Sequence, residues 1–173
     1  MFLSAVIMRF SITEKNMKTF EFIAPCHFGL EAVLKREIQD LGYEVSAVED
    51  GRVSFYGDIN AVCRANIFLR TAERVLLKAG QFKATTFEEL FDKTKELPWE
   101  EWIPEDGKFW VTKASSIKSK LFSPSDIQSI AKKAMVERMK QEYNMDWFPE
   151  DGASYPVRIF LLKDEVTVTI DTT

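Results

Sequence analysis

An Asp-Gly pair at positions 50 and 51 separates two short runs, residues 44–49 and 52–56, whose composition favours β-strands. A two-residue connection between antiparallel strands needs a positive backbone φ, and glycine adopts that conformation at little cost. The pair therefore predicts a tight β-hairpin. Any fold for this part of the chain has to be built around two adjacent antiparallel strands.

The segments on either side of the hairpin complete a regular pattern. Apolar residues alternate along residues 19–24, as in a strand, and recur at helical spacing from Leu30 to Leu41. In chain order we expect a strand at 19–24, a helix from Gly29 to Leu41, the hairpin, a helix capped by Asp58 and running to Phe68, and a strand at 74–82. This βαββαβ order is that of a ferredoxin-like unit.

The second half of the chain has different signals. Thr86 and Glu89 match a capping box, and Pro124 follows Ser123 as it would at the first position of a helix. In order we expect a helix from Thr86 that Pro98 ends, a short aromatic segment with Trp99 and Trp102, a strand at 108–114, a long helix to Tyr143, and strands at 155–162 and 166–170. The order is αα-β-α-ββ, and the chain as a whole belongs to the α+β class.

We place the domain boundary at residues 84–86. This divides the chain into a leader of uncertain structure at 1–16, which could add an edge strand at 6–12, a ferredoxin-like domain at 17–84, and a second domain at 85–173. In the last strand Val166, Val168 and Ile170 alternate with polar residues, so we expect one buried and one exposed face.

Composition excludes several classes of protein. The net charge of -4 argues against a protein that coats nucleic acid indiscriminately, although a local basic patch is compatible with it. Two cysteines and one histidine are too few for a disulfide framework or a tetrahedral zinc site, and they suit the reducing cytoplasm. Cys26 and His27 are adjacent but lack further partners, which favours a structural role over a nucleophile. The apolar run at 2–8 is too short to span a membrane.

Charge is unevenly distributed in the second half. Residues 86–107 carry eight acidic and two basic side chains, whereas residues 108–143 carry eight basic and three acidic ones. On the long helix Ile127, Ala131 and Met135 belong to an inward stripe, and Lys132, Lys133 and Lys140 fall off it. We therefore expect these lysines to be free to meet a partner.

The stretch from Lys113 to Tyr143 is the main candidate for binding. It predicts a strand end, a polar basic loop and a helix start, which together offer ammonium groups, hydroxyls and backbone N–H groups that suit phosphate. The candidate RNA-contacting residues are Lys113, Ser115, Ser116, Lys118, Ser119, Lys120, Lys132 and Lys133. A solvated surface is the alternative for the lysines, and a cap of the following helix is the favoured role for Ser123.

Three stretches carry a resemblance to a known family. They are Pro25-Cys26-His27-Phe28-Gly29-Leu30-Glu31, Leu69-Arg70-Thr71-Ala72-Glu73-Arg74-Val75, and the segment from Lys113 to Ala134. Together they resemble the N-terminal portion of bacterial THUMP-containing methyltransferases, above all the 23S ribosomal RNA guanine-N2 methyltransferases that are often labelled N6-adenine-specific DNA methylases. The likeness covers essentially Met17 to Thr173.

The resemblance implies both a fold and a function. In that family a ferredoxin-like domain precedes a THUMP domain, and the pair binds RNA and presents it to a C-terminal methyltransferase domain that uses S-adenosylmethionine. This sequence has no Gly-rich turn after a strand and no Asn/Asp-Pro-Pro-aromatic motif. We therefore expect a cytoplasmic RNA-binding fragment with no membrane contact, no cofactor in this chain and no catalysis of its own, whose partners are 23S rRNA and a catalytic domain of the same polypeptide.

The mechanism we expect is recognition of RNA shape and backbone, because A-form RNA hides its base edges in a deep, narrow groove. The loop at residues 115–123 would supply the contacts, and the acidic helices would face away. Arg70 and Arg74 are expected to form ion pairs, and Trp99, Trp102 and Trp110 to pack in the core rather than stack on bases.

Two other functions remain open. A ferredoxin-like unit can also serve as a dimerisation or ligand-sensing module that does not bind RNA. An acylphosphatase-like hydrolase would need an arginine and an asparagine around the loop at 25–29, and that loop has neither.

Overall fold

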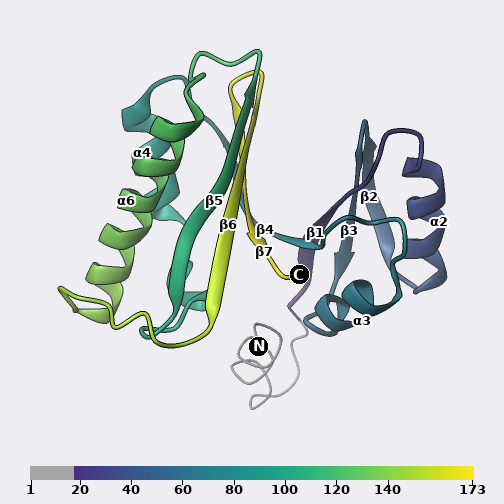
Figure 1. Ribbon diagram of the computed structural model, residues 1–173, viewed down its shortest axis with the longest axis horizontal. Helices are drawn as coiled ribbons and strands as arrows, with labels where there is room; N and C mark the ends of the chain where they lie inside the picture. The colour runs from purple at the N-terminus through teal and green to yellow at the C-terminus, as the bar shows by residue number, and fades with distance from the viewer. Residues whose placement is uncertain (1–17) are drawn as a thin grey trace. The chain divides into compact units, whose positions relative to one another are not determined.

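The computed structural model describes residues 18–173, which form two compact units (Figure 1). The first unit runs to Lys78 and also takes in Asp171–Thr173, and the second comprises Ala79–Ile170. The leader expected at residues 1–16, with its candidate edge strand at 6–12, lies outside the described residues.

The first unit has the predicted order of strands and helices. Its elements are β1 (Phe20–Pro25), α2 (Glu31–Asp40), β2 (Glu44–Glu49), β3 (Arg52–Gly57), α3 (Asn60–Phe68) and β4 (Leu76–Lys83). The strands lie in the order β2-β3-β1-β4, and β1 pairs antiparallel with both β3 and β4. This confirms the ferredoxin-like prediction.

The β2–β3 hairpin forms where the Asp-Gly pair predicted it. Glu49 pairs with Arg52, and Gly51 has a φ of +74°. The Glu31 carboxylate accepts hydrogen bonds from the backbone N–H of Gly51 at 2.9 Å and of Gly29 at 2.8 Å. These bonds, the one from Gly51 foremost, lower the pKa of Glu31. One carboxylate thus fixes both the hairpin and the loop between β1 and α2.

The core of the first unit lies between its strands and helices. Phe22 and Phe55 stack with ring centroids 5.3 Å apart, and Leu34 and Ile38 of α2 are fully buried. The Asp58 carboxylate accepts a hydrogen bond from the N–H of Ala61 at 3.1 Å, as expected of a residue that caps α3.

The C-terminal tail of the chain belongs to this unit. The Thr172 N–H donates to the Val75 carbonyl at 3.1 Å, and Arg74 Nη1 lies 3.0 Å from Asp171 Oδ2. Arg70 Nε lies 3.8 Å from Glu37 Oε1. The prediction that both arginines form ion pairs is confirmed.

The second unit also follows the predicted order. Besides the last part of β4, its elements are α4 (Phe87–Glu96), α5 (Trp99–Trp102), β5 (Lys108–Ile117), α6 (Pro124–Tyr143), β6 (Ser154–Leu162) and β7 (Glu165–Asp171). The strand order is β4-β7-β6-β5. β5 runs parallel to β6, whereas β6 and β7 are antiparallel and joined through Lys163 and Asp164, which have φ values of +50° and +66°.

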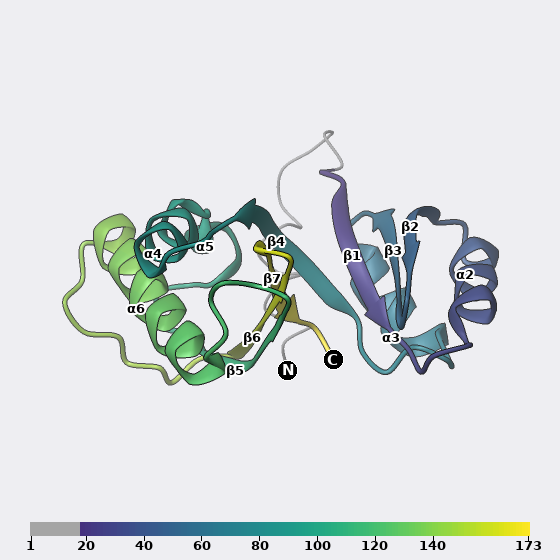
Figure 2. The same cartoon turned by 90° about the horizontal axis from the view of Figure 1, so that it is seen from above.

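Helices α4 and α6 pack against each other beside the strands of this unit, as Figure 1 and the view from above in Figure 2 both show. The Thr86 hydroxyl accepts a hydrogen bond from the Glu89 N–H at 3.2 Å, which confirms the helix start. Trp99 is fully buried and donates its indole N–H to the Thr94 carbonyl at 2.8 Å. Trp102 is also buried, so the core assignment of these two tryptophans is confirmed, whereas Trp110 of the strand at 108–117 is exposed and its core assignment is wrong.

The acidic and basic halves of the second unit contact each other. Arg138 of α6 donates to Glu100 of α5 through both Nε, at 3.0 Å, and Nη2, at 2.5 Å. Lys95 of α4 lies 3.4 Å from Glu137 of α6. The expectation that the acidic helices simply face away therefore needs correction, because they neutralise part of the charge of α6.

Two further expectations are wrong. β5 continues to Ile117 instead of ending at residue 114, so Ser115 and Ser116 lie in the strand and not in the loop. In β7 the polar face is buried as well, with Thr167 and Thr169 shielded from solvent. The strand lies between β4 and β6, and the Thr169 hydroxyl finds a partner in the Arg158 carbonyl at 3.0 Å.

The close approach of β3 to α3 generates a prediction. A Cβ at Gly57 would lie 2.5 Å from the Cβ of Ala61, which is fixed by the helix backbone. We expect Gly57→Ala to lower the free energy of unfolding by about 1–3 kcal/mol, because neither atom can move without shifting the backbone. Urea denaturation measures this change.

Gly80→Ala is the matched control. The added Cβ would lie 2.4 Å from Cδ2 of Leu97, the mobile end of a flexible side chain. This variant should be the milder of the two, and equal losses for both would contradict the role assigned to Gly57.

The Glu100–Arg138 pair predicts a dependence of stability on pH. Hydrogen bonds from Arg138 are the main cause that lowers the pKa of Glu100. A lowered carboxylate pKa means that the stabilisation is present at neutral pH, declines as the pH falls past the ordinary value of about 4.3, and is gone below the lowered pKa. Glu100→Gln should therefore lose about 1 kcal/mol at pH 7 and converge with the wild type near pH 3.

Glu137→Gln provides the comparison, because Glu137 is more exposed and its ion pair with Lys95 is longer. Its effect at pH 7 should be smaller. The denaturation midpoint of Glu100→Gln is compared with that of the wild type at pH 7 and at pH 3. An equal difference at both pH values would contradict the ion-pair assignment.

Candidate nucleic-acid interface

The basic stretch of the sequence lies at the carboxyl ends of the two parallel strands β5 and β6. Ile117, the last residue of β5, is the register partner of Leu162, the last residue of β6. From there residues 118–123, which we call the tip loop, lead into α6, and the Lys163 N–H donates to the Ile117 carbonyl at 3.1 Å. The tip loop and the β6–β7 turn are thus neighbours.

Hydrogen bonds hold the tip loop against that turn. The Ser119 hydroxyl donates to the Ile117 carbonyl at 3.1 Å and accepts from the Asp164 N–H at 3.0 Å. The Lys120 N–H donates to Asp164 Oδ1 at 2.7 Å. Ser116 donates its hydroxyl to the Leu121 carbonyl. The hydroxyl protons of Ser116 and Ser119 are therefore committed inside the protein, and both serines fix the shape of the loop.

Four of the predicted lysines are exposed, namely Lys113, Lys118, Lys120 and Lys133. No salt bridge joins any of these four to another residue within 18–173. Lys118 has a φ of +49°, an uncommon conformation for a residue with a side chain, and it opens the tip loop. These ammonium groups are available to a negatively charged partner.

Lys132 is different, and the expectation that it is free is wrong. Its half-buried ammonium group donates a hydrogen bond to the Phe109 carbonyl, lies 3.7 Å from the centroid of the Phe109 ring, and is 3.5 Å from Glu150 Oε1. Burial lowers the pKa of Lys132, while Glu150 opposes this shift. Helical spacing placed Lys132 beside the inward stripe of α6. It could not show that Phe109 of β5 lies in contact with the Lys132 side chain.

Two residues of this surface, Phe122 and Lys163, were not predicted from the sequence. Phe122 of the tip loop is 81% exposed, although the preceding Leu121 is buried. Ile117 and Leu162 nearby are 58% and 42% exposed. Lys163 adds an exposed ammonium group from the turn. A Leu-Phe pair in the sequence does not reveal which of its two members faces solvent, so no signal could have identified Phe122.

The remaining candidates lie around this surface. Ser115 is half-buried in β5, and Ser123 occupies the predicted position before α6. The Ser123 hydroxyl lies 3.2 Å from that of Ser125 and makes no side-chain cap bond to the helix backbone. Pro124 is at the start of the helix, as predicted.

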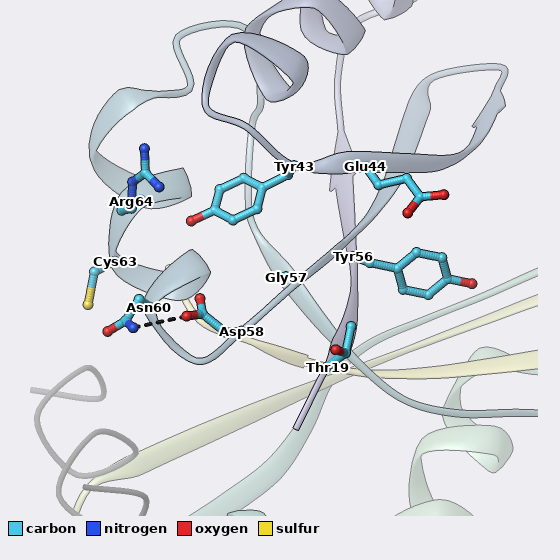
Figure 3. A pocket seen from close by; sticks show the side chains of 9 residues that line it. All are labelled: Thr19, Tyr43, Glu44, Tyr56, Gly57, Asp58, Asn60, Cys63 and Arg64. Atoms are coloured by element: carbon cyan, nitrogen blue, oxygen red, sulfur yellow. Dashed lines mark hydrogen bonds between the residues drawn. The ribbon is translucent and has the colours of Figure 1, made fainter. Parts of the chain in front are cut away.

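The first unit has an open hollow of about 710 Å³ beside Tyr43, Tyr56 and the start of α3 (Figure 3). Arg64 lies over the Tyr43 ring at 5.4 Å, and burial raises the pKa of the Tyr43 hydroxyl. Glu44 and Asp58 also line it, so its carboxylates outnumber its single cation. Phosphate is disfavoured in such a hollow, which leaves the tip loop as the better candidate.

The described residues contain no cluster of metal-ligating side chains. Cys26 is buried, and burial raises the pKa of its thiol, whereas the exposed His27 lies 3.5 Å from Glu73. Among residues 18–173, no helix has the length and apolar character needed to cross a membrane.

Comparison with known proteins identifies both units. Residues 21–76 match the model of the RlmL ferredoxin-like domain, and residues 84–171 match the model of the THUMP domain. This chain is similar to YpsC of Bacillus subtilis, which is provisionally named an RNA methyltransferase. The two are 49% identical over 90% of this chain and 40% of that protein. The ribosomal RNA large subunit methyltransferase K/L of Cellvibrio japonicus is 31% identical over 53% of this chain and 12% of its own length.

A solved structure also resembles this chain. The crystal structure of SMU.472, which is provisionally called a methyltransferase and is complexed with SAH, superposes with a TM-score of 0.85 and 41% identity over 89% of this chain and 41% of that one. The chain thus spans about 40% of YpsC and of SMU.472. It belongs to the THUMP-domain family, with a ferredoxin-like domain of the RlmL type in front of the THUMP domain.

Proposed function

We propose that this chain is the RNA-binding module of an S-adenosylmethionine-dependent rRNA methyltransferase. It grips structured RNA by its backbone and presents it to a C-terminal catalytic domain that lies outside these residues. The observation that carries the proposal is a tip loop of fixed shape with exposed lysines. Lys118 and Lys120 of the loop and Lys163 of the adjoining turn form no ion pair within residues 18–173.

Electrostatics support phosphate as the group that is bound. Lys118 and Lys120 belong to the tip loop, Lys113 precedes it in β5, and Lys133 follows in α6. Ammonium groups that neutralise phosphates release condensed counterions, so affinity falls steeply as salt rises. Backbone and shape recognition fits double-stranded RNA, whose deep groove side chains cannot read.

We assign different roles to the candidate contact residues. We propose direct contact for Lys113, Lys118, Lys120 and Lys133, and we add Lys163. Ser116 and Ser119 support the loop through their hydrogen bonds, and Ser115 stays a candidate because its hydroxyl is not committed in this way. Lys132 can contribute only if RNA displaces it from Phe109 and Glu150.

The relatives support the remaining parts of the proposal. A family model named for RlmL and a relative named as a large-subunit rRNA methyltransferase favour 23S rRNA for the whole protein. A relative named as a tRNA guanine-N2 methyltransferase favours the N2 atom of guanine, and a neighbour with bound SAH favours S-adenosylmethionine. A cytoplasmic location follows from this role. We retain the division into 17–84 and 85–173 as our proposed domain boundary.

Charge reversal in the tip loop tests the proposal. Lys118→Glu together with Lys120→Glu should weaken binding to a structured fragment of 23S rRNA several-fold at low salt. The slope of log affinity against log salt should fall by about 1 to 2, because each phosphate contact adds roughly 0.7–0.9. Filter binding or fluorescence anisotropy across a salt series measures both quantities.

The double variant Lys35→Glu, Arg36→Glu is the matched control. Both residues are exposed on α2 of the first unit, so the change in net charge is the same. It should leave the salt slope nearly unchanged. Unaltered affinity of the tip-loop variant at low salt would overturn the proposal and favour a dimerisation or ligand-sensing module, which sedimentation would then reveal.

A further inference from the structure

A shallow groove of about 300 Å³ lies between α4 and α6 of the second unit. Its apolar lining consists of Phe87 and Phe91 of α4 and Ile130 of α6, all three of them half-buried. The contact of α4 with the core is made elsewhere on the helix, by the fully buried Leu90 and Thr94. The two phenylalanine rings, one helical turn apart, therefore form an apolar surface beside the core that nothing within residues 18–173 covers completely.

The two sides of this groove carry opposite charges. Glu88 and Asp92, which are also one turn apart, line it from α4, and Lys133 lines it from α6. All three side chains are exposed, and no salt bridge joins any of them to another residue within 18–173. The apolar surface is thus bordered by one negative and one positive side, and both sides can pair with a partner.

The helices that form the groove are held together. Lys95 and Glu137 follow Phe91 and Lys133 by one helical turn, and their ion pair of 3.4 Å joins α4 to α6 just beyond the groove. The two helices also pack against each other along their length. Because the groove exists before any partner arrives, binding does not have to include the cost of forming it.

From these features we propose that the groove binds an amphipathic α-helix of another protein. The apolar side chains of such a helix recur every three or four residues and form a seam that packs between two adjacent helices. Lysine or arginine on one flank of the partner pairs with Glu88 and Asp92, and glutamate on its other flank pairs with Lys133. The apolar seam supplies affinity, and the two charged flanks select the partner.

Nucleic acid fits this groove less well than a protein does. RNA would bring its phosphates against Glu88 and Asp92, whose carboxylates repel them. An apolar centre with a polar rim is instead the ordinary composition of a protein interface. The tip loop takes no part in this inference, and Lys133 is the one proposed RNA contact that also lines the groove. The variants that test the groove therefore change α4 and leave Lys133 as it is.

Two synthetic peptides of about 21 residues are the probes, a length at which an isolated helix can form. The first has leucines along one seam, lysines on one flank and glutamates on the other. The second has the same composition, but its leucines are distributed around the helix so that no seam exists. Fluorescence anisotropy of the labelled peptides should show that the protein binds the first about tenfold more tightly than the second.

Charge reversal on α4 tests the pairing of the flanks. Glu88→Lys together with Asp92→Lys should weaken binding of the first peptide about five- to tenfold, because attractive contacts become repulsive. Asp146→Lys together with Asp151→Lys is the matched control, since both are exposed carboxylates of the second unit that lie outside the groove. This control changes the net charge equally and should bind the peptide as the wild type does.

The apolar part of the groove is tested separately. Phe91→Ala should weaken binding of the first peptide about tenfold, whereas Phe91→Leu keeps an apolar side chain and should retain most of the affinity. Circular dichroism shows whether each variant is folded. The charge-reversal pair changes only exposed residues and tests the inference even if Phe91→Ala does not fold.

Three results would overturn the inference. Wild-type protein could bind both peptides equally, or the reversal of Glu88 and Asp92 could leave the affinity unchanged. An equal loss in the control pair would show that net charge alone governs binding. Sedimentation velocity of the protein without peptide identifies another occupant, because a dimer that Glu88→Lys with Asp92→Lys dissociates would assign the groove to a second copy of this chain.

Discussion

The second unit depends on the parallel pairing of β5 with β6. Parallel neighbours cannot be joined by a hairpin, so the chain has to cross over, and the twenty-residue helix α6 is that crossover. The segment between the first strand of such a pair and its helix necessarily lies at the carboxyl ends of both strands. The tip loop, the start of α6 and the β6–β7 turn come together for this reason, and not because any single motif specifies a binding site.

The elements themselves could be predicted because their signals are local. The Asp50-Gly51 hairpin, the Thr86 cap and the Pro124 helix start each depend on residues a few positions apart, and all three lie where they were expected. Pairing between distant segments carries no such signal. The partner of β5, its extension to Ile117 and the burial of Thr167 and Thr169 follow from which strands become neighbours, which periodicity alone does not encode.

The candidate site, like the fold, could be predicted from the sequence only in part. Composition located the basic segment correctly, but it could not separate lysines that serve the fold from lysines that face solvent. Lys132 and Lys133 are adjacent in sequence, yet one contacts Phe109 and Glu150 while the other is exposed. Likewise Arg138 contributes to the basic count of residues 108–143 but is paired with Glu100. The charge available to a partner is therefore smaller than the sequence suggests.

A limited positive charge favours selective binding. A cationic surface spread over the whole unit would attract any polyanion, since phosphate contacts carry no sequence information. The pairing of Lys132 and Arg138 inside the unit lowers that background, while hydrogen bonds of Ser116, Ser119 and Asp164 keep the loop in one shape. Phe122 is the largest exposed apolar group of that loop. Ser116 and Ser119 were expected to contact phosphate, but their hydrogen bonds instead fix the geometry of the loop that carries Lys118, Lys120 and Phe122.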